Sequence, residues 1–243
     1  MTPSQPPQPP PDPPPAITPA QARELDRLAV EELGIPSIVL MENAAINATL
    51  AVLDHLADTR EREPHDAKLA ILCGGGNNGG DGYAIARHLH NWGAHPTLFP
   101  LKPLDQITGD AATNAHITQQ LGLPTRTLDD PQDLQPFDAV LDAWLGTGVT
   151  GPLRPDTANT VRQLNDLHHP ALIAIDCPTG LNPITGQPDP TALRAELTIT
   201  FAAPKLGFNQ PSAQRFLGKR VIADIGTPPA LLDRVLDDST SAP

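Results

Sequence analysis

The apolar residues near the start of the folded body recur at helical spacing. Thr18 can cap a helix, Pro19 suits its first position and Gln21 completes a capping box. Gly34 is expected to end this helix, because glycine readily adopts the left-handed conformation that follows many helices. The apolar positions that predict it are Leu25, Leu28, Ala29 and Leu33.

The pattern then predicts a long apolar helix from Ser37, as its cap, toward Asp58, followed by alternating strands and helices. The expected strands are residues 68–73, 96–101, 138–144, 171–176, 197–203 and 219–224. Further helices are expected near residues 81–92, 108–121 and 155–168. Apolar strands separated by helices are typical of an α/β fold with a mainly parallel sheet covered on both faces.

The two ends of the chain differ from this body in composition. Nine of the first 15 residues are proline, so residues 1–16 are predicted to form a disordered, proline-rich tail. That tail is either a spacer or a ligand for a proline-binding groove. Residues 237–243 are polar and are expected to form a flexible C-terminal tail. Residues 17–236 are predicted to form one domain.

Charge and composition exclude several classes of function. The net charge of −12 leaves no basic surplus, which argues against nucleic acid or an anionic membrane as a partner. No run approaches the ~18 apolar residues of a membrane span, and no secretory signal is visible. The only cysteines, Cys73 and Cys177, lie in apolar runs, so no disulfide framework is expected. A reducing compartment, the cytoplasm, is the expected location.

A glycine-rich segment follows the first predicted strand. Glycines at positions 74–76, 79 and 80 would allow a backbone cradle for phosphate, with the next helix directing its free N–H groups at the anion. Asn77 and Asn78 add amide donors and acceptors. Alternatively, these asparagines and Asp81 only form a turn and cap the helix. Lys102 stands where an ordinary dinucleotide oxidoreductase would have its ribose-binding acid, which argues against hydride transfer.

Carboxylates follow two later strands, and parallel strands bring their carboxyl ends to one edge. Asp142 precedes a second glycine loop with Thr147 and Thr150, and its alternative role is that of a capping acid. Asp176 precedes a Pro-Thr-Gly turn and is either catalytic or a local turn anchor. Lys102 falls on the same edge, although a lysine past a strand is usually a solvated surface charge.

The candidate chemistry at this edge favours oxygen-binding cations. Amides, hydroxyls and a carboxylate suit such ions, whereas no His/Cys cluster with zinc spacing and no Ser/His/Asp arrangement is found in the sequence. Cys177 is next to Asp176, which disfavours its thiolate. It is therefore predicted to be a packed thiol.

Four motifs, in this order and spacing, resemble the NAD(P)H-hydrate epimerase family. They are GGGNNGGDG, LDAWLGTG, IDCPTGL and TFAAPKLG, and the opening capped helix and the MENA stretch at residues 41–44 also resemble that family. The resemblance covers residues 17–236. It implies a Rossmann-like three-layer αβα sandwich and interconversion of the R and S epimers of hydrated NADH and NADPH at C6 of the nicotinamide ring.

The resemblance also implies roles for single residues. Asp176 would be the principal acid/base residue, with Lys102 near the reacting ring. A potassium ion would be held by Asn78, Asp142 and Thr179; the family usually has serine at the last position. The substrate would be bound by Asn77, Asn78, Gly79, Gly80, Asp81, Gly146, Thr147, Gly148, Val149, Thr150, Gly151, Pro152 and Asp176.

Partners and alternatives complete these expectations. The resemblance implies a homodimer, formed through the N-terminal helices, and a functional link to an ATP- or ADP-dependent dehydratase, expected as a separate protein. Two alternatives stay open: a catalytically silent nucleotide-binding or scaffold module of the same fold, and a dinucleotide-dependent oxidoreductase. Hydrated NADH and hydrated NADPH are both expected as substrates.

Overall fold

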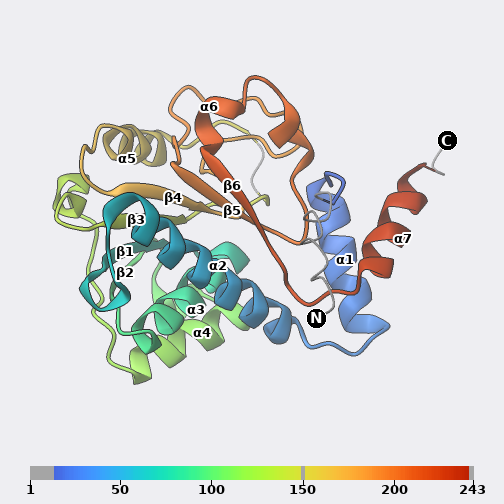
Figure 1. The fold of residues 1–243 in the computed structure, drawn as a ribbon, viewed down its shortest axis with the longest axis horizontal. Coiled ribbons are helices and arrows are strands. Elements are labelled where there is room, and N and C mark those ends of the chain that lie inside the picture. The colour runs from blue at the N-terminus through green and yellow to red at the C-terminus, as the bar shows by residue number, and fades with distance from the viewer. Residues whose placement is uncertain (1–13, 149–150, 241–243) are drawn as a thin grey trace, which may run out of the picture.

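The computed structural model describes residues 14–148 and 151–240, and its centre is a six-stranded sheet (Figure 1). All strands are parallel, in the order β2-β1-β3-β4-β5-β6. The strands are β1 (Lys68–Cys73), β2 (His95–Pro100), β3 (Ala139–Ala143), β4 (Ala171–Ile175), β5 (Leu197–Phe201) and β6 (Lys219–Ala223). The predicted parallel α/β fold is confirmed, and all six predicted strands are present.

Helices occupy both sides of this sheet. They are α1 (Pro19–Glu31), α2 (Ser37–Arg60), α3 (Asn77–Asn91), α4 (Gly109–Gln120), α5 (Pro155–Asn165), α6 (Gln214–Leu217) and α7 (Pro229–Thr240). Short 3-10 segments are η1 (Pro64–Asp66), η2 (Leu104–Gln106), η3 (Pro131–Leu134) and η4 (Leu206–Asn209).

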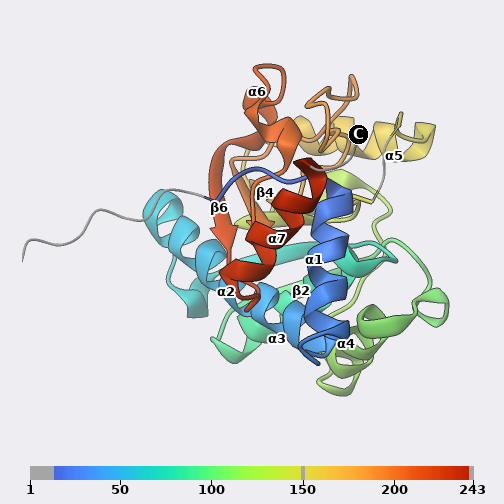
Figure 2. The same cartoon turned by 90° about the vertical axis from the view of Figure 1, so that its right-hand side faces the viewer.

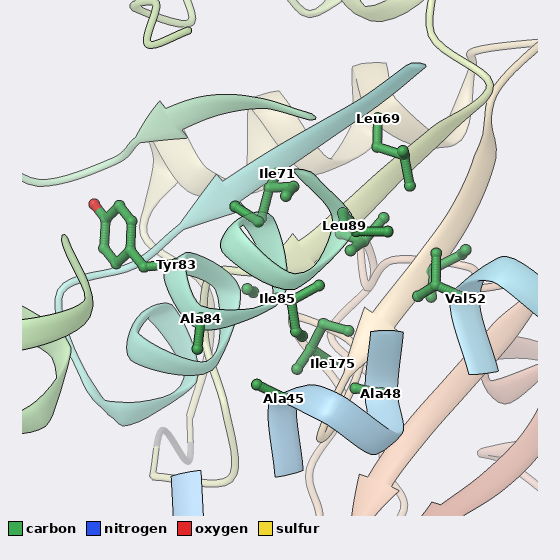
Figure 3. Close-up of a cluster of buried hydrophobic side chains, with 14 of the residues drawn as sticks. Ala45, Ala48, Val52, Leu69, Ile71, Tyr83, Ala84, Ile85, Leu89 and Ile175 are labelled. Atoms are coloured by element: carbon green, nitrogen blue, oxygen red, sulfur yellow. The ribbon is translucent and has the colours of Figure 1, made fainter. Parts of the chain in front are cut away.

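Two apolar clusters show how the three layers form. On one face, Leu69 and Ile71 of β1 pack with side chains of α2, α3 and α4 (Figure 3). On the other face, Ala70 and Leu72 of the same strand pack with α5 and η3. Alternate residues of a strand point to opposite faces, so a strand that is covered on both sides must be apolar throughout.

A third cluster joins the two ends of the described chain. Helices α1 and α7 lie side by side, and Leu25 and Leu28 pack there with Leu231 and Val235 (Figures 1 and 2). Helix α7 was not predicted from the sequence, and it includes residues 237–240 of the predicted flexible tail. Residues 1–13 of the predicted N-terminal tail lie outside the described residues.

The predicted element starts are right in one case and wrong in two. Thr18 accepts from the N–H of Gln21, and the capping box of α1 is complete. Ser37 is not a cap, because it is the first residue of α2 and Pro36 precedes the helix. Helix α3 begins at Asn77, four residues before the expected start at Asp81.

Helix α2 departs from the expectation that no segment could span a membrane. Its length and mean hydropathy would be enough to cross a membrane, although 44% of the 18-residue stretch that meets this criterion is buried inside the protein. Ala45, Ala48 and Val52 pack in the cluster between the sheet and α3 (Figure 3). One side of α2 therefore packs in the core of the fold.

The strand order defines where a ligand site is expected. From β1 the chain moves to β2 on one side and then returns to β3 on the other side of β1. In open α/β sheets, ligands bind beyond the carboxyl ends of the strands where the order reverses in this way. Here that point lies between the loops that follow β1 and β3.

Candidate functional site

The loops after β1 and β3 are in direct backbone contact. The N–H of Gly74 donates to the carbonyl of Ala143 over 2.9 Å. A Cβ at Gly74 would lie 2.0 Å from the carbonyl oxygen of Trp144, and a Cβ at Gly79 would lie 1.9 Å from that of Gly74. These glycines are required by close packing, because any side chain would overlap neighbouring backbone.

The Asn-Asn-Gly-Gly segment forms the first turn of α3 rather than a loop. Gly76 is the N-cap, and no described side chain caps this helix. The expected capping by Asn77, Asn78 or Asp81 is therefore wrong, because all three residues lie inside the helix. The free N–H groups of the first turn adjoin a cavity lined by Gly76, Asn77 and Asn78.

Asn78 lies against the loop that follows β3. A Cβ at Gly146 would lie 3.0 Å from the Cβ of Asn78. The Asn78 amide is buried, and its nitrogen and oxygen have no hydrogen-bond partner among the described residues. An unpartnered buried amide costs free energy unless a ligand or an ion satisfies it.

Asp142 and Thr179 form the polar connection between β3 and the turn after β4. The N–H of Thr179 donates to Oδ2 of Asp142 and the Thr179 hydroxyl donates to Oδ1, each over 2.8 Å. The N–H of Trp144 also donates to Oδ1, over 3.2 Å. Burial raises the pKa of Asp142 to about 6, although the hydrogen bonds from Thr179 and Trp144 lower it in part.

The three predicted cation ligands therefore adjoin one short segment, residues 144–146. Asn78 lies against Gly146, Asp142 accepts from Trp144, and the Thr179 hydroxyl accepts from the N–H of Leu145 over 3.3 Å. An amide, a carboxylate and a hydroxyl form an oxygen donor set that suits a hard cation. Thr179 is fully buried, so the structure accommodates its methyl group.

Asp176 is the first residue after β4 and has left-handed backbone, with φ of 64°. Its Oδ1 is 2.9 Å from Nζ of Lys205 and accepts a longer hydrogen bond of 3.4 Å from the hydroxyl of Thr200. The described residues provide no hydrogen bond to Oδ2. Asp176 lines the cavity, so its carboxylate borders the space that a ligand would occupy.

A cavity of about 560 Å³ lies in front of these groups. The ionisable residues on its wall come from α1 (Arg23 and Asp26), α3 (Asp81), α4 (Asp110) and the turns after β4 and β5 (Asp176 and Lys205). Desolvation in the cavity raises the pKa of Asp26 to about 6, although its surface remains open to solvent, and burial raises the pKa of Asp81 well above its ordinary value. The negative charge of Asp176 adds to both shifts, while Lys205 opposes them.

Two of these cavity residues, Lys205 and Asp26, were missed by sequence reasoning. Lys205 lies within the motif TFAAPKLG, which supports the family resemblance but does not by itself indicate a catalytic or binding role. Asp26 lies on α1, whose apolar pattern drew attention to Leu25 and Leu28 instead. A lone lysine or aspartate carries little signal by itself, since either is usually a solvated charge.

The predicted substrate loop after β3 divides between two cavities. Gly146, Thr147 and Gly148 line the large cavity. Gly151 and Pro152 line a neighbouring cavity of about 290 Å³. Val149 and Thr150, also predicted to bind substrate, lie outside the described residues. Gly79 and Gly80 do not line the large cavity but are buried beneath it in α3.

Lys102 lies at the edge of the site rather than in the cavity wall. Its side chain is exposed and crosses Gly75, where a Cβ would lie 2.3 Å from Cδ of Lys102. It is absent from the described lining of the large cavity. Its assignment to the reacting ring stays a prediction.

The cysteines match their prediction. Cys73 and Cys177 are free and buried, and burial raises the pKa of both thiols. Among the described residues, no group of three or more His, Cys, Asp or Glu side chains is placed to hold a metal ion.

Comparisons with known proteins fit this geometry. Residues 37–207 match the family described as YjeF-related protein N-terminus. The NAD(P)H-hydrate epimerase of Rhodopirellula baltica is 39% identical over 89% of this chain and 86% of that protein. The corresponding enzyme of Limosilactobacillus fermentum is 35% identical over 86% of this chain and 96% of that protein.

Longer relatives and a solved structure extend the comparison. The bifunctional NAD(P)H-hydrate repair enzyme Nnr of Moorella thermoacetica is 38% identical over 89% of this chain, which spans 41% of that protein. The crystal structure of yeast YNL200c matches with a TM-score of 0.68 and 23% identity, covering 79% of this chain and 82% of that chain. That likeness supports the three-layer fold.

Proposed function

Because this chain belongs to the family described as YjeF-related protein N-terminus, we propose that it is an NAD(P)H-hydrate epimerase. Such an isomerase interconverts the R and S epimers of hydrated NADH or NADPH at C6 of the nicotinamide ring and serves nicotinamide nucleotide repair. The observation that carries the proposal is the placement of Asp176 on a cavity of about 560 Å³, with Asn77 and Asn78 on the same wall. That arrangement joins an acid/base group to a site for a nucleotide.

The phosphates of the substrate would adjoin the first turn of α3 and the loop after β3. Both places offer backbone N–H groups, which hold anions without a basic surface. This explains how a chain with a net charge of −12 can take a pyrophosphate-bearing substrate. Asn77 and Asp81 of α3 and Thr147 of the loop would line the ligand, as the cavity wall suggests.

The chemistry proposed for Asp176 is acid/base catalysis at C6. The carboxylic acid protonates the hydroxyl on C6, which leaves as water, and the ring nitrogen stabilises the resulting cation. Water then adds to the opposite face of C6 and returns its proton to the carboxylate. Positioned acid/base groups typically contribute ~10²–10⁴-fold to a rate. Lys102 is the second proposed catalytic residue, at the exposed edge beside Gly75.

A potassium ion is the proposed cofactor, held by Asn78, Asp142 and Thr179. The unpartnered Asn78 amide and the buried Asp142 carboxylate support it, since a cation would satisfy the first and offset the charge of the second. Its charge, when bound, would favour the phosphates of the substrate next to an acidic cavity.

The decisive experiment follows epimer conversion. Purified R-hydrate of NADH is incubated with the protein in potassium buffer, and the epimers are separated by chromatography. We expect conversion faster than the spontaneous rate, and loss of that acceleration in Asp176→Asn with the fold retained. Undiminished turnover in Asp176→Asn would remove Asp176 from the mechanism.

The same assay separates the two alternative functions. A catalytically silent binding module would bind the hydrate without accelerating its epimerisation. A dinucleotide-dependent oxidoreductase would instead consume NADH itself. The preference between NADH hydrate and NADPH hydrate is read from kcat/KM for each.

Partners and location are part of the proposal. The proposed homodimer uses the N-terminal helices, where Val39, Ile46 and Leu50 of α2 are exposed apolar residues. A dehydratase that acts on the same hydrates, with ATP or ADP, is the proposed functional partner. Two free, buried cysteines suit the cytoplasm as the proposed location.

A further inference from the structure

Two neighbouring strands end in the same unusual turn. Asp176 follows β4 with φ of 64°, and Ala202 follows β5 with φ of 61°. The next N–H donates two residues back in each case, from Cys177 to Ile175 over 2.8 Å and from Ala203 to Phe201 over 2.7 Å. Left-handed backbone is unfavourable for a non-glycine residue, so such turns persist only where surrounding contacts fix them.

One buried lysine connects these two turns. Lys205 is 2% exposed, and its Nζ is 2.9 Å from Oδ1 of Asp176. The same Nζ donates to the carbonyls of Phe201 over 3.1 Å and Ala203 over 3.3 Å. Three acceptors match the three donors of an ammonium group, which makes its burial tolerable.

The backbone of Lys205 is held from outside the sheet. The N–H of Ile17 donates to the carbonyl of Pro204, and that of Leu206 donates to the carbonyl of Ile17, each over 2.8 Å. Ile17 is fully buried and directly precedes the cap of α1. The segment that leads into α1 therefore fixes where the ammonium group lies.

We propose that Lys205 is the positioning residue for Asp176: it holds Oδ1 through Nζ and leaves Oδ2 directed to the substrate. This inference rests on the proposed epimerase function. Misplacement of a reacting group by about 1 Å can lower the rate by about 10²-fold. The gain in rate from a fixed Asp176 carboxylate therefore offsets the unfavourable burial of the Lys205 ammonium group.

The other charged groups on the cavity wall make Lys205 hard to replace. Asp26, Asp81 and Asp110 are acidic, and Arg23 of α1 is exposed. Lys205 lowers the pKa of both Asp26 and Asp81, opposing their burial. Without it, Asp176 would share the cavity with acidic neighbours and lose the contact that orients it.

Lys205→Met tests this role, because methionine is of similar length and lacks the charge. We expect kcat to fall by about 10²-fold while KM changes little, because the substrate contacts of α3 and the β3 loop remain. Loss of an ammonium group also raises the pKa of nearby carboxylates. Because Asp176 acts as the protonated acid in the proposed first step, the alkaline limb of the pH–rate profile should move to higher pH. A merely structural lysine would lower the melting temperature and leave that limb in place.

Two further variants keep the test interpretable. Lys68→Met changes an exposed lysine at the start of β1 and should leave kcat and the pH profile unchanged. If Lys205→Met does not fold, Lys205→Arg provides the test. A planar guanidinium cannot reproduce the three contacts of an ammonium group, and we expect kcat to fall by about 10-fold or more in folded protein.

The outcomes separate this inference from the proposed function. Absence of epimerisation by the unmodified chain would overturn the proposed function. An active chain, an inactive Asp176→Asn variant and a fully active Lys205→Met or Lys205→Arg variant would overturn the positioning role alone.

Discussion

Thr179 donates twice to Asp142, through its backbone N–H to Oδ2 and through its hydroxyl to Oδ1, over 2.8 Å in both cases. The pair joins the end of β3 to the turn after β4 and is buried on both sides. One contact is therefore fixed by the backbone, whereas the other depends on the side chain. The two contributions can be separated by mutation.

Thr179→Val should destabilise the protein by about 1.5–3 kcal/mol, because valine keeps the shape but removes a hydrogen bond to a buried carboxylate. Urea unfolding at pH 7 measures the difference. Thr179→Ser is the matched control, since it keeps the hydroxyl and loses only a methyl group. The proposed potassium ion predicts that added potassium raises the melting temperature of the Ser variant but not of the Val variant. Equal unfolding midpoints for all three proteins would contradict a stabilising role of the hydroxyl.

Gly79→Ala should be strongly destabilising, because its Cβ would lie 1.9 Å from the carbonyl oxygen of Gly74. Overpacking of this kind typically costs 1–3 kcal/mol and more where backbone must move. Gly76→Ala is the control three residues earlier, where no atom lies within 4 Å of the new Cβ. Thermal unfolding should separate the two variants, and a Gly79→Ala protein as stable as Gly76→Ala would contradict the packing argument.

The sheet and its functional edge could be predicted because they depend on local pattern. Apolar runs identified the strands, and parallel order then placed Asp142 and Asp176 at one edge. The start of α3 could not be predicted in the same way. Two asparagines and two glycines are poor helix formers, and their helical state is set by packing of Gly79 on Gly74 and of Gly80 on α2 and α4.

Lys205 shows a second limit of sequence reasoning. Its burial depends on acceptors from Asp176, Phe201 and Ala203, and two of these are backbone carbonyls exposed by a left-handed turn at Ala202. No local sequence pattern predicts a left-handed turn at an alanine. Helix α7 was missed for a simpler reason: its apolar residues find their partners on α1, far away in the sequence.

Asp26→Asn should change how stability depends on pH. The pKa of Asp26 in the folded state is about 6, above the ordinary value of 3.8, so the folded state binds a proton more tightly than the unfolded state. Asp26 therefore lowers stability as pH rises from about 4 to about 6, and the penalty is constant above that range. Asparagine removes the penalty.

The measurement is urea unfolding of both proteins between pH 4 and pH 8. The stability of Asp26→Asn relative to the unmodified chain should increase across the window from about pH 4 to about pH 6 and then level off. Asp26 is open to solvent at the cavity, which weakens electrostatic effects. We therefore expect the pH-dependent difference in the free energy of unfolding between the two proteins to be less than about 1 kcal/mol. Asp54→Asn, at an exposed carboxylate of α2 outside the described cavities, is the control. A relative stability that decreases with pH would have the wrong sign.

Ile46→Glu tests the proposed homodimer. Ile46 is 39% exposed on α2, between Val39 at 42% and Leu50 at 38%, and these positions share one side of the helix. A glutamate placed in an apolar interface must be desolvated, so the variant should sediment as a monomer at micromolar concentration where the unmodified chain is a dimer. Its kcat should be retained, because Ile46 does not line the described cavities.

Ile184→Glu, at an isoleucine with 42% exposure in the loop after β4, is the matched control and should remain dimeric. An unmodified chain that already sediments as a monomer would rule out the dimer at that concentration, and a dimeric Ile46→Glu protein would exclude this face of α2.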